Sequence, residues 1–417
     1  MGGCSWGGQS GLTKTEVGYV MKKFLYGTTA LVASGMVAGA ASAAEPISLG
    51  LSGYYTSVLA LSDDDAPGTG DTSVKQDAEI IFSGSTTLDN GLTAGVEVIM
   101  EAATSADQID EHYAYLEGSF GRVEIGSDDG AAFKMGYVAP FPTDGHGVDT
   151  PGFLHISRAS SRTSALITMS ADANKITYFT PRFSGFQLGF SYTPEVDPVA
   201  VGAAGQPGLV FGTPGTGTGG GPAFGVRSSV NGGIEDILEV AGNYWGKYED
   251  VEIGISLAYS QGDRESAGIT AAGAGISPAV TGDPEAYHAG ISLSTAGFTV
   301  SGAWYESEDL VAGAGVAGAG LPGLDEEAWN LGVIYETGPW KVGVAYLDSE
   351  TDTPAGTALG GELSLLDLGA QYTLGPGVAI GADLTFAEDE VPNAAATVLS
   401  PSSIENTTLA LSLLLTF

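Results

Sequence analysis

Basic residues and cysteines are scarce in this sequence, and each scarcity excludes a class of function. Only 14 Lys and Arg stand against 50 Asp and Glu, which gives a formal net charge of −36, and no basic cluster occurs. A nucleic-acid-binding protein needs a positive surface, so that class is excluded. The one cysteine, Cys4, lies in a segment that we expect to be removed. Disulfides, zinc–thiolate sites and a cysteine nucleophile are therefore excluded from the mature chain.

Histidines are also few, and no nucleophile motif accompanies them. The four imidazoles are His112, His146, His155 and His288, and no G-x-S-x-G pentapeptide occurs beyond residue 43. A barrel lipase or protease would need an assembled nucleophile and base. We therefore predict that the protein is not an enzyme and name no catalytic residue.

Long apolar runs are missing beyond residue 43, so no transmembrane helix is predicted. The apolar stretch before that point starts with two lysines and ends in Ala41-Ser42-Ala43, which is the pattern of a secretory signal peptide. We expect residues 1–20 to be a mis-called extension, residues 21–43 the signal peptide and residues 44–417 the mature chain. An exported chain without such a helix can cross a membrane only as a β-barrel.

Alternation and short turns are what the sequence does contain. Apolar residues alternate with Gly, Ser and acids in segments 251–260 and 378–387, as in strands with one lipid face and one wet face. Seven short turns, including the hairpin signal Asn90-Gly91, join fourteen such strands. A first strand from Ile47 to about Leu61 and a last strand from Ile404 to Phe417 bring the number to sixteen. We predict an all-β fold, a 16-stranded antiparallel transmembrane β-barrel.

The last strand, "NTTLALSLLLTF", shows the expected two faces with one exception. Odd-numbered positions from Leu409 to Phe417 are apolar and would meet lipid, and this strand should pair with the first to remove both sheet edges. Leu414 breaks the alternation, and we predict that it makes a subunit contact. Aromatic residues gather at both ends of the strands, which is typical of membrane-interface girdles.

Two motifs and the terminal Phe417 carry a family resemblance. The segments "AYLEGSFGRVEIG" and "NKITYFTPRFSGFQLGFSYTPE" flank a long third loop, residues 127–173. They resemble those of Gram-negative general diffusion porins, in particular the alphaproteobacterial, Rhodobacter-like branch. The resemblance implies a homotrimer of 16-stranded barrels in the cell outer membrane, exported through the periplasm, which passes ions and small hydrophilic solutes. It also implies that Phe417 is read by the barrel-insertion machinery.

The resemblance further implies that the third loop folds inward as a constriction, with acids on the loop facing bases on the wall. The loop lacks the P-E-F-G motif of enterobacterial porins. The candidate acids are Asp128, Asp129, Asp144 and Asp149, and the candidate bases are Arg122, Arg158, Arg162, Lys175 and Arg182. The i, i+4 spacing of Arg158 and Arg162 would place both on one face of a short helix. Because acids dominate the lumen and mouth, we predict a cation-selective, water-filled channel.

Two other functions and one ion stay open. A substrate-specific barrel channel, for instance for sugars, would need a row of aromatic side chains along the lumen. A secreted acidic β-rich adhesin fits a Gly-rich chain, but the sequence has no repeat of 20–50 residues. No cofactor is required by the prediction, although acidic loops such as Asp63-Asp64-Asp65 could hold Ca²⁺ or bridge lipopolysaccharide through divalent ions.

Overall fold

Sixteen antiparallel strands and one short helix make up the part of the chain that the computed structural model describes. The described residues are 46–66, 69–103, 109–144, 146–149, 159–196, 234–264, 282–310, 324–352, 360–391 and 402–417. The expected extension and signal peptide lie outside them. None of the helical residues in these ranges forms a segment long and apolar enough to cross a membrane.

The elements follow the chain in a simple order, and the only described helix lies between the fifth and sixth strands. They are β1 (Gly50–Asp64), β2 (Thr72–Thr87), β3 (Thr93–Glu101), β4 (Glu111–Gly118), β5 (Gly121–Ser127), α2 (Ala131–Lys134), β6 (Asn174–Phe179), β7 (Phe186–Glu195), β8 (Ile234–Tyr248), β9 (Val251–Arg264), β10 (Glu285–Thr295), β11 (Phe298–Leu310), β12 (Leu324–Thr337), β13 (Trp340–Thr351), β14 (Gly361–Gly375), β15 (Val378–Glu390) and β16 (Ser403–Thr416).

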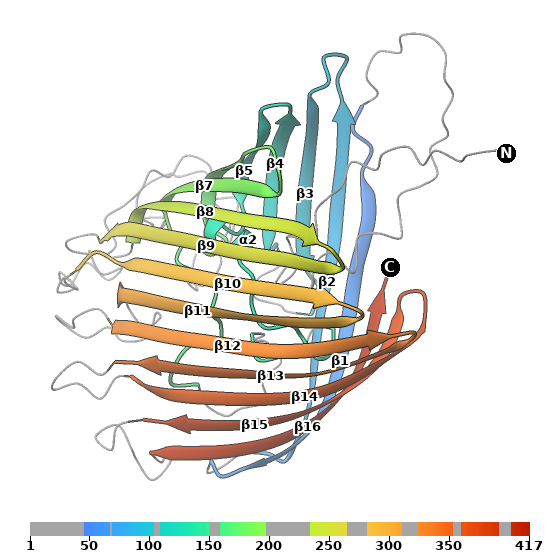
Figure 1. Ribbon diagram of the computed structural model, residues 1–417, viewed down its shortest axis with the longest axis vertical. Coiled ribbons are helices and arrows are strands. Elements are labelled where there is room, and N and C mark those ends of the chain that lie inside the picture. Colours follow the sequence, from blue (N-terminus) through green and yellow to red (C-terminus); the bar gives the residue numbers. More distant parts are fainter. Residues whose placement is uncertain are drawn as a thin grey trace, which may run out of the picture.

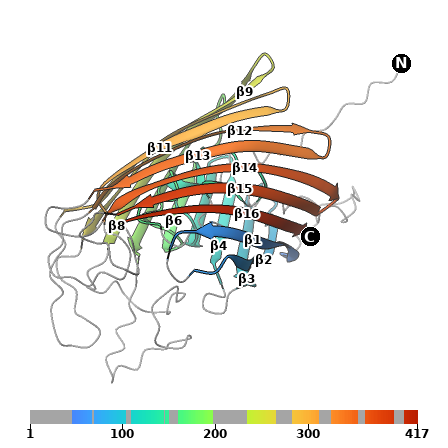
Figure 2. The same cartoon turned by 90° about the horizontal axis from the view of Figure 1, so that it is seen from below.

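Each strand pairs with the next one along the chain, and β16 returns to β1 to close the barrel (Figure 1). In the closing pair, Tyr55 lies opposite Leu415 and Asp64 lies opposite Asn406. Seen from below, the wall curves from β9 round to β16 and continues into β1–β3 (Figure 2). The predicted strand number, short turns and closing pair are confirmed. The first strand is shifted along the chain by three residues, from the expected start at Ile47 to Gly50.

Side chains alternate across the wall as predicted. On β9, Ile255 and Leu257 point outward with 43% and 62% of their surface exposed, whereas Ser256 and Ser260 are buried inside. The exposed apolar face is what a barrel presents to lipid. The chain therefore puts its apolar residues on the outside and its small and polar residues on the inside.

Aromatic pairs on neighbouring strands mark both ends of the barrel. Beside the short turns, the ring centroids of Phe298 and Tyr335 are 4.4 Å apart. Near the long loops, the rings of Trp329 and Tyr346 are 5.2 Å apart. Such pairs at both strand ends match the predicted girdles, where amphipathic rings suit the interface between lipid and water.

Leu414 points into the barrel, so the predicted subunit contact is wrong. Its side chain is 4% exposed and packs against Tyr54 and Ala379, which are buried as well. Even-numbered positions of β16 face inward, and Leu414 lies opposite Thr56 of β1. The exception in the alternation is therefore an apolar residue that fills the inside of the closing seam.

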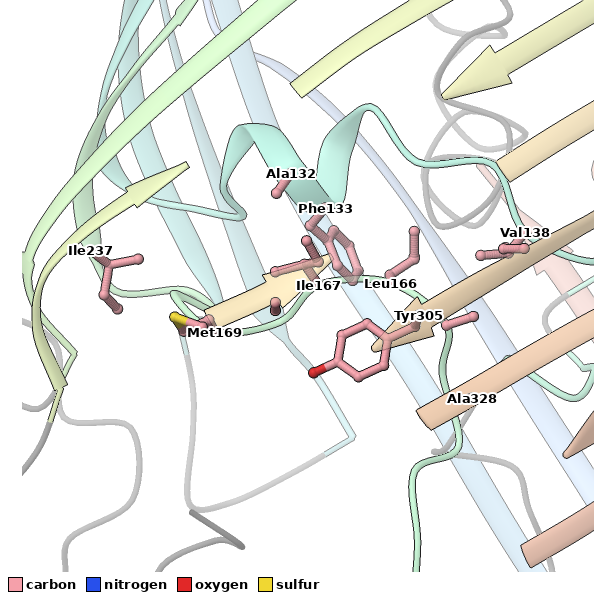
Figure 3. Packing of buried hydrophobic residues seen from close by; sticks show 12 residues of the cluster. Ala132, Phe133, Val138, Leu166, Ile167, Met169, Ile237, Tyr305 and Ala328 are labelled. Atoms are coloured by element: carbon pink, nitrogen blue, oxygen red, sulfur yellow. The ribbon is translucent and has the colours of Figure 1, made fainter. Parts of the chain in front are cut away.

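A small hydrophobic core lies inside the barrel, and the third loop builds it. Phe133 on α2 packs with Leu166, Ile167 and Met169 from the returning half of the loop. Figure 3 shows this group beside Tyr305 of β11, and the cluster also includes wall residues on β8, β10 and β12. The inner face of these strands was expected to be wet. That expectation is wrong here, because the third loop buries it.

Replacing Leu414 tests its inward position. Leu414→Ala should lower the free energy of unfolding by about 2–4 kcal/mol, because it leaves a cavity between Tyr54 and Ala379. The matched control is Leu413→Ala on the same strand. The Leu413 side chain is 40% exposed on the outer face, so this substitution should lower the free energy of unfolding by less than half as much. Guanidinium unfolding of protein refolded into lipid vesicles measures both. Equal losses would contradict the inward placement.

Candidate channel constriction

The third loop follows the inner wall because polar side chains on the wall accept its backbone N–H groups. Buried N–H groups must find acceptors, and irregular backbone cannot supply them itself. The wall supplies them at several points, from β7 to β15. They include Ala131 N–H to Ser191 (2.7 Å), Ala132 N–H to Glu239 (3.1 Å), Tyr137 N–H to Ser256 (2.9 Å), Ala139 N–H to Asn330 (2.9 Å), Asp144 N–H to Gln371 (2.7 Å) and Ser160 N–H to Asp389 (2.5 Å).

Two glycines on the wall make room for this close approach. A Cβ at Gly290 would collide with the carbonyl of Tyr137, and a Cβ at Gly369 would collide with Pro142 and with Asp383. Because glycine carries no side chain, the loop backbone can lie directly against the strands. The inward fold of the third loop, expected from the family resemblance, thus has a local basis in the sequence.

The four predicted constriction acids all lie on the described part of the loop, in different surroundings. Asp128 is buried and forms an ion pair with Lys134. Asp144 lies 2.8 Å from the Lys341 ammonium on β13 and accepts a hydrogen bond from Gln371. Asp129 is half-buried, and its N–H donates to the Asp128 carboxylate. At least Asp128 and Asp144 therefore anchor the loop, and their effect on permeating ions stays a prediction.

Asp149 is the most enclosed of the four acids. Its carboxylate accepts hydrogen bonds from the Ser164 hydroxyl, the Ala165 N–H and the Asn330 amide, so it joins both halves of the loop to β12. Burial raises the pKa of Asp149 to about 6, although these hydrogen bonds act in the opposite direction. The contact between the third loop and β12 therefore contains a carboxyl group, that of Asp149, with a raised pKa.

Arg122 belongs to a charge network at the base of the loop. Its Nε donates to Glu124 at 2.6 Å, and the Lys134 ammonium lies 2.8 Å from the other oxygen of the same carboxylate. The Arg122 guanidinium also lies 3.7 Å from the centre of the Tyr115 ring, a cation–π contact. Arg122 was among the predicted bases. Lys134 was not, although its position close to Asp128 in the sequence was a usable signal.

Arg162 links the end of the loop to the wall. Its guanidinium lies 3.2 Å from Glu326 and 3.8 Å from the centre of the Tyr305 ring, and it donates to the Leu166 carbonyl at 2.7 Å. Arg162 lies in irregular backbone, so the predicted short helix is wrong at this residue. Its partner in that prediction, Arg158, lies outside the described residues.

The last two predicted bases donate to neutral oxygens, Lys175 to backbone carbonyls and Arg182 to one backbone carbonyl and two side-chain amides. Lys175, on β6, donates to the carbonyls of Ala171 and Ala173 at 2.5 and 2.8 Å. Arg182 lies in the turn between β6 and β7. Its guanidinium donates to Gly185 at 2.6 Å and to Asn243 at 2.8 Å.

Acids that sequence reasoning missed line the inner faces of β2 and β3. The Tyr54 hydroxyl donates to Asp77 at 3.0 Å and to Glu79 at 2.9 Å, and the Tyr113 hydroxyl donates to Glu97 at 2.9 Å. The alternation of these strands was the signal that could have found them. The predicted site residues came only from the third loop and the strands that flank it, so these acids were not among them.

A family model described as Gram-negative porin matches residues 27–391. Among curated proteins, an uncharacterized protein of Rickettsia conorii is 25% identical over 130 residues, and one of Rickettsia felis is 24% identical over 130 residues. Each match covers 25% of this chain and 30% of the relative, so it spans less than a third of the relatives' length.

Solved structures resemble the chain over most of its length. The anion-selective porin from Comamonas acidovorans has a TM-score of 0.53 at 14% identity and covers 89% of this chain and 100% of its own. Salmonella typhi OmpF has a TM-score of 0.57 at 14% identity, and the match covers 88% of this chain and 97% of OmpF. The trimer form of Vibrio cholerae OmpT has a TM-score of 0.55 at 11% identity, and the match covers 89% of this chain and 100% of OmpT. At these identities the likeness shows the shared fold.

The proton on Asp149 gives a testable pH dependence. Its pKa in the folded state, about 6, lies above the ordinary carboxyl value, so the folded state binds the proton more tightly. Stability contributed by this group is therefore complete below about pH 4 and declines as the pH rises toward 6. From pH 7 to pH 5, wild type should gain about 1 kcal/mol relative to Asp149→Asn in guanidinium unfolding. A difference that does not change with pH would contradict the assignment.

Proposed function

This chain belongs to the Gram-negative porin family, and from that premise we propose how its outer-membrane channel selects what passes. The channel is a water-filled pore for passive diffusion of ions and small hydrophilic solutes, and it prefers cations. The supporting observation is the balance of charges inside the barrel. The inner faces of β2 and β3 carry four acids, Asp77, Glu79, Glu97 and Glu101, and one base, Lys75.

The bases near the third loop do little to offset this negative wall. Arg122 pairs with Glu124, Lys134 pairs with both Glu124 and Asp128, Arg162 pairs with Glu326, and Lys341 pairs with Asp144. An ion pair has a much weaker field at a distance than a single charge. The unbalanced charge in the lumen is therefore negative. Low-dielectric walls focus that field along the channel, which raises the local concentration of cations.

We also propose that the protein is a homotrimer, as the resemblance implies. The support is the fold that it shares with the trimer form of Vibrio cholerae OmpT. Recognition of Phe417 by the insertion machinery is proposed on the same basis. The backbone of Phe417 exchanges hydrogen bonds with Gly53, at 3.1 and 2.9 Å, so the residue is part of the closing seam.

Other functions lack a supporting observation. The family and the fold are those of a channel, and we propose no catalytic activity. Calcium at Asp63–Asp65 stays a prediction. Asp63 and Asp64 lie at the end of β1 rather than in a loop, and Asp64 already accepts hydrogen bonds from the Ala66 N–H at 2.7 Å and from the Asn406 amide at 3.1 Å.

Bilayer recordings test the selectivity. Purified protein under a salt gradient should show a reversal potential whose sign indicates a preference for cations. A trimer should close in three equal current steps. Asp77→Asn combined with Glu97→Gln should lower the cation-to-anion permeability ratio about twofold or more, because it removes two lumen charges. The control is Asp250→Asn in the exposed turn between β8 and β9, which should leave the ratio unchanged. An anionic reversal potential in wild type would overturn the proposed selectivity.

Arg162→Ala tests whether the position of the third loop sets the size of the channel. The substitution removes the contacts with Glu326, the Tyr305 ring and the Leu166 carbonyl. The loop end should then move more freely, and the single-channel current should become larger or noisier. Arg162→Lys keeps a positive charge to pair with Glu326, so its single-channel current should lie between that of Arg162→Ala and that of wild type. A current identical to wild type in Arg162→Ala would remove this residue from the constriction.

A further inference from the structure

Three buried side chains converge where the third loop meets β14 and β15. His146 comes from the loop, Asp367 from β14 and Asp383 from β15, and each is at most 3% exposed. The imidazole Nδ1 of His146 lies 3.7 Å from Oδ2 of Asp367 and 3.8 Å from Oδ1 of Asp383. One ligand atom from each residue can be chosen so that all three lie within 4.8 Å of one another.

A tight turn places the imidazole at this point. The His146 N–H donates to the Thr143 carbonyl at 3.2 Å, and the Thr143 hydroxyl donates to Asp383 at 2.8 Å. Gly369 lies next to this turn, and any side chain there would collide with Asp383 and Pro142. The turn is thus held against the wall from two sides, and the cluster is part of that contact.

One oxygen of the cluster accepts no hydrogen bond. Asp367 is 1% exposed, and its Oδ1 accepts a hydrogen bond from the Thr385 hydroxyl at 3.1 Å. Its Oδ2 is buried without a hydrogen-bond donor and is the atom nearest the imidazole of His146. Burying a carboxylate oxygen in this way is costly unless a cation compensates it.

We propose that His146, Asp367 and Asp383 bind one divalent transition-metal ion of the zinc class. Zinc bonds to imidazole nitrogen and carboxylate oxygen are about 2.0–2.2 Å long, which places neighbouring ligand atoms roughly 3.3–3.6 Å apart. The distances of 3.7 and 3.8 Å need to shorten by only a few tenths of an ångström. Two carboxylates also neutralise a divalent ion, with the imidazole as a neutral third ligand.

The donor set decides between metal classes. Calcium and magnesium take oxygen ligands, calcium six to eight of them, whereas imidazole suits zinc, nickel and copper. Among the residues that the structure describes, two other groups of acids lie close enough together to hold an ion. They are Glu79, Glu101 and Asp110, and Glu111, Asp129 and Asp172. Both lack an imidazole and include half-exposed members, so neither carries the same inference.

The consequence is a metal cross-link between the third loop and the barrel wall. The ion joins residue 146 to strands more than 200 positions away in the chain, and its binding energy stabilises the inward position of the loop. This site does not depend on which ions cross the channel. Metal binding is measured without any current, so its failure and the failure of the proposed selectivity can be told apart.

The test uses the full mature chain without a histidine tag, purified in detergent and stripped with a chelator. Zn²⁺ titrated by calorimetry should bind once per chain, and Co²⁺ should give the visible absorption of a tetrahedral site. His146→Gln and Asp367→Asn should each weaken Zn²⁺ binding by about tenfold or more. The control is His112→Gln, which removes an imidazole on β4. This variant should bind Zn²⁺ with the same affinity as wild type.

Folding is checked in every variant by heat-modifiable mobility on a gel. Asp367→Asn keeps the shape of the side chain, so it carries the test if His146→Gln does not fold. Absence of a stoichiometric Zn²⁺ site in wild type would overturn the proposal and favour a protonated imidazole between the two carboxylates. Undiminished binding in the folded variants would overturn it as well.

Discussion

The need to satisfy every backbone polar group without water governs this structure. In lipid, an unpaired N–H or C=O is too costly to expose, so a chain without an apolar helix must close its sheet. Pairing of β16 with β1 achieves this closure, and the sixteen described strands depend on it. Closure also fixes which residues face inward. The seam itself is filled by Leu414 against Tyr54, a contact that only a closed barrel brings together.

The same need explains how an irregular loop can lie inside the barrel. The inner wall is polar, and its Glu, Ser and Asn side chains accept the N–H groups that the loop cannot pair for itself. Phe133 and its neighbours then add a small apolar core against β8 to β12. An inner face rich in Ser, Gly and acids is therefore only partly a water-facing surface. Along the loop it is a docking surface whose pattern resembles that of a wet wall.

This ambiguity sets the limit of what sequence could predict. Strand number, turns and facing depend on local periodicity, and the alternation around Ile255 was enough to assign them. The path of the third loop depends on contacts such as Ala139 with Asn330, 191 positions apart, for which no periodic signal exists. His146 seemed an isolated imidazole for the same reason, because its two carboxylates lie on β14 and β15. The expected helix does not form at Arg162, whose side chain contacts Glu326 and Tyr305 on the wall instead.

The few basic residues of the third loop and its surroundings have a structural role. Arg122, Lys134 and Arg162 each join a carboxylate to an aromatic ring or a loop carbonyl. A partly buried cation in such a position is best kept paired, because removing its partner leaves an uncompensated charge. The bases are thus used to hold the loop, and few remain to balance the acids of β2 and β3. An acidic lumen follows from how the loop is anchored as well as from the composition of the chain.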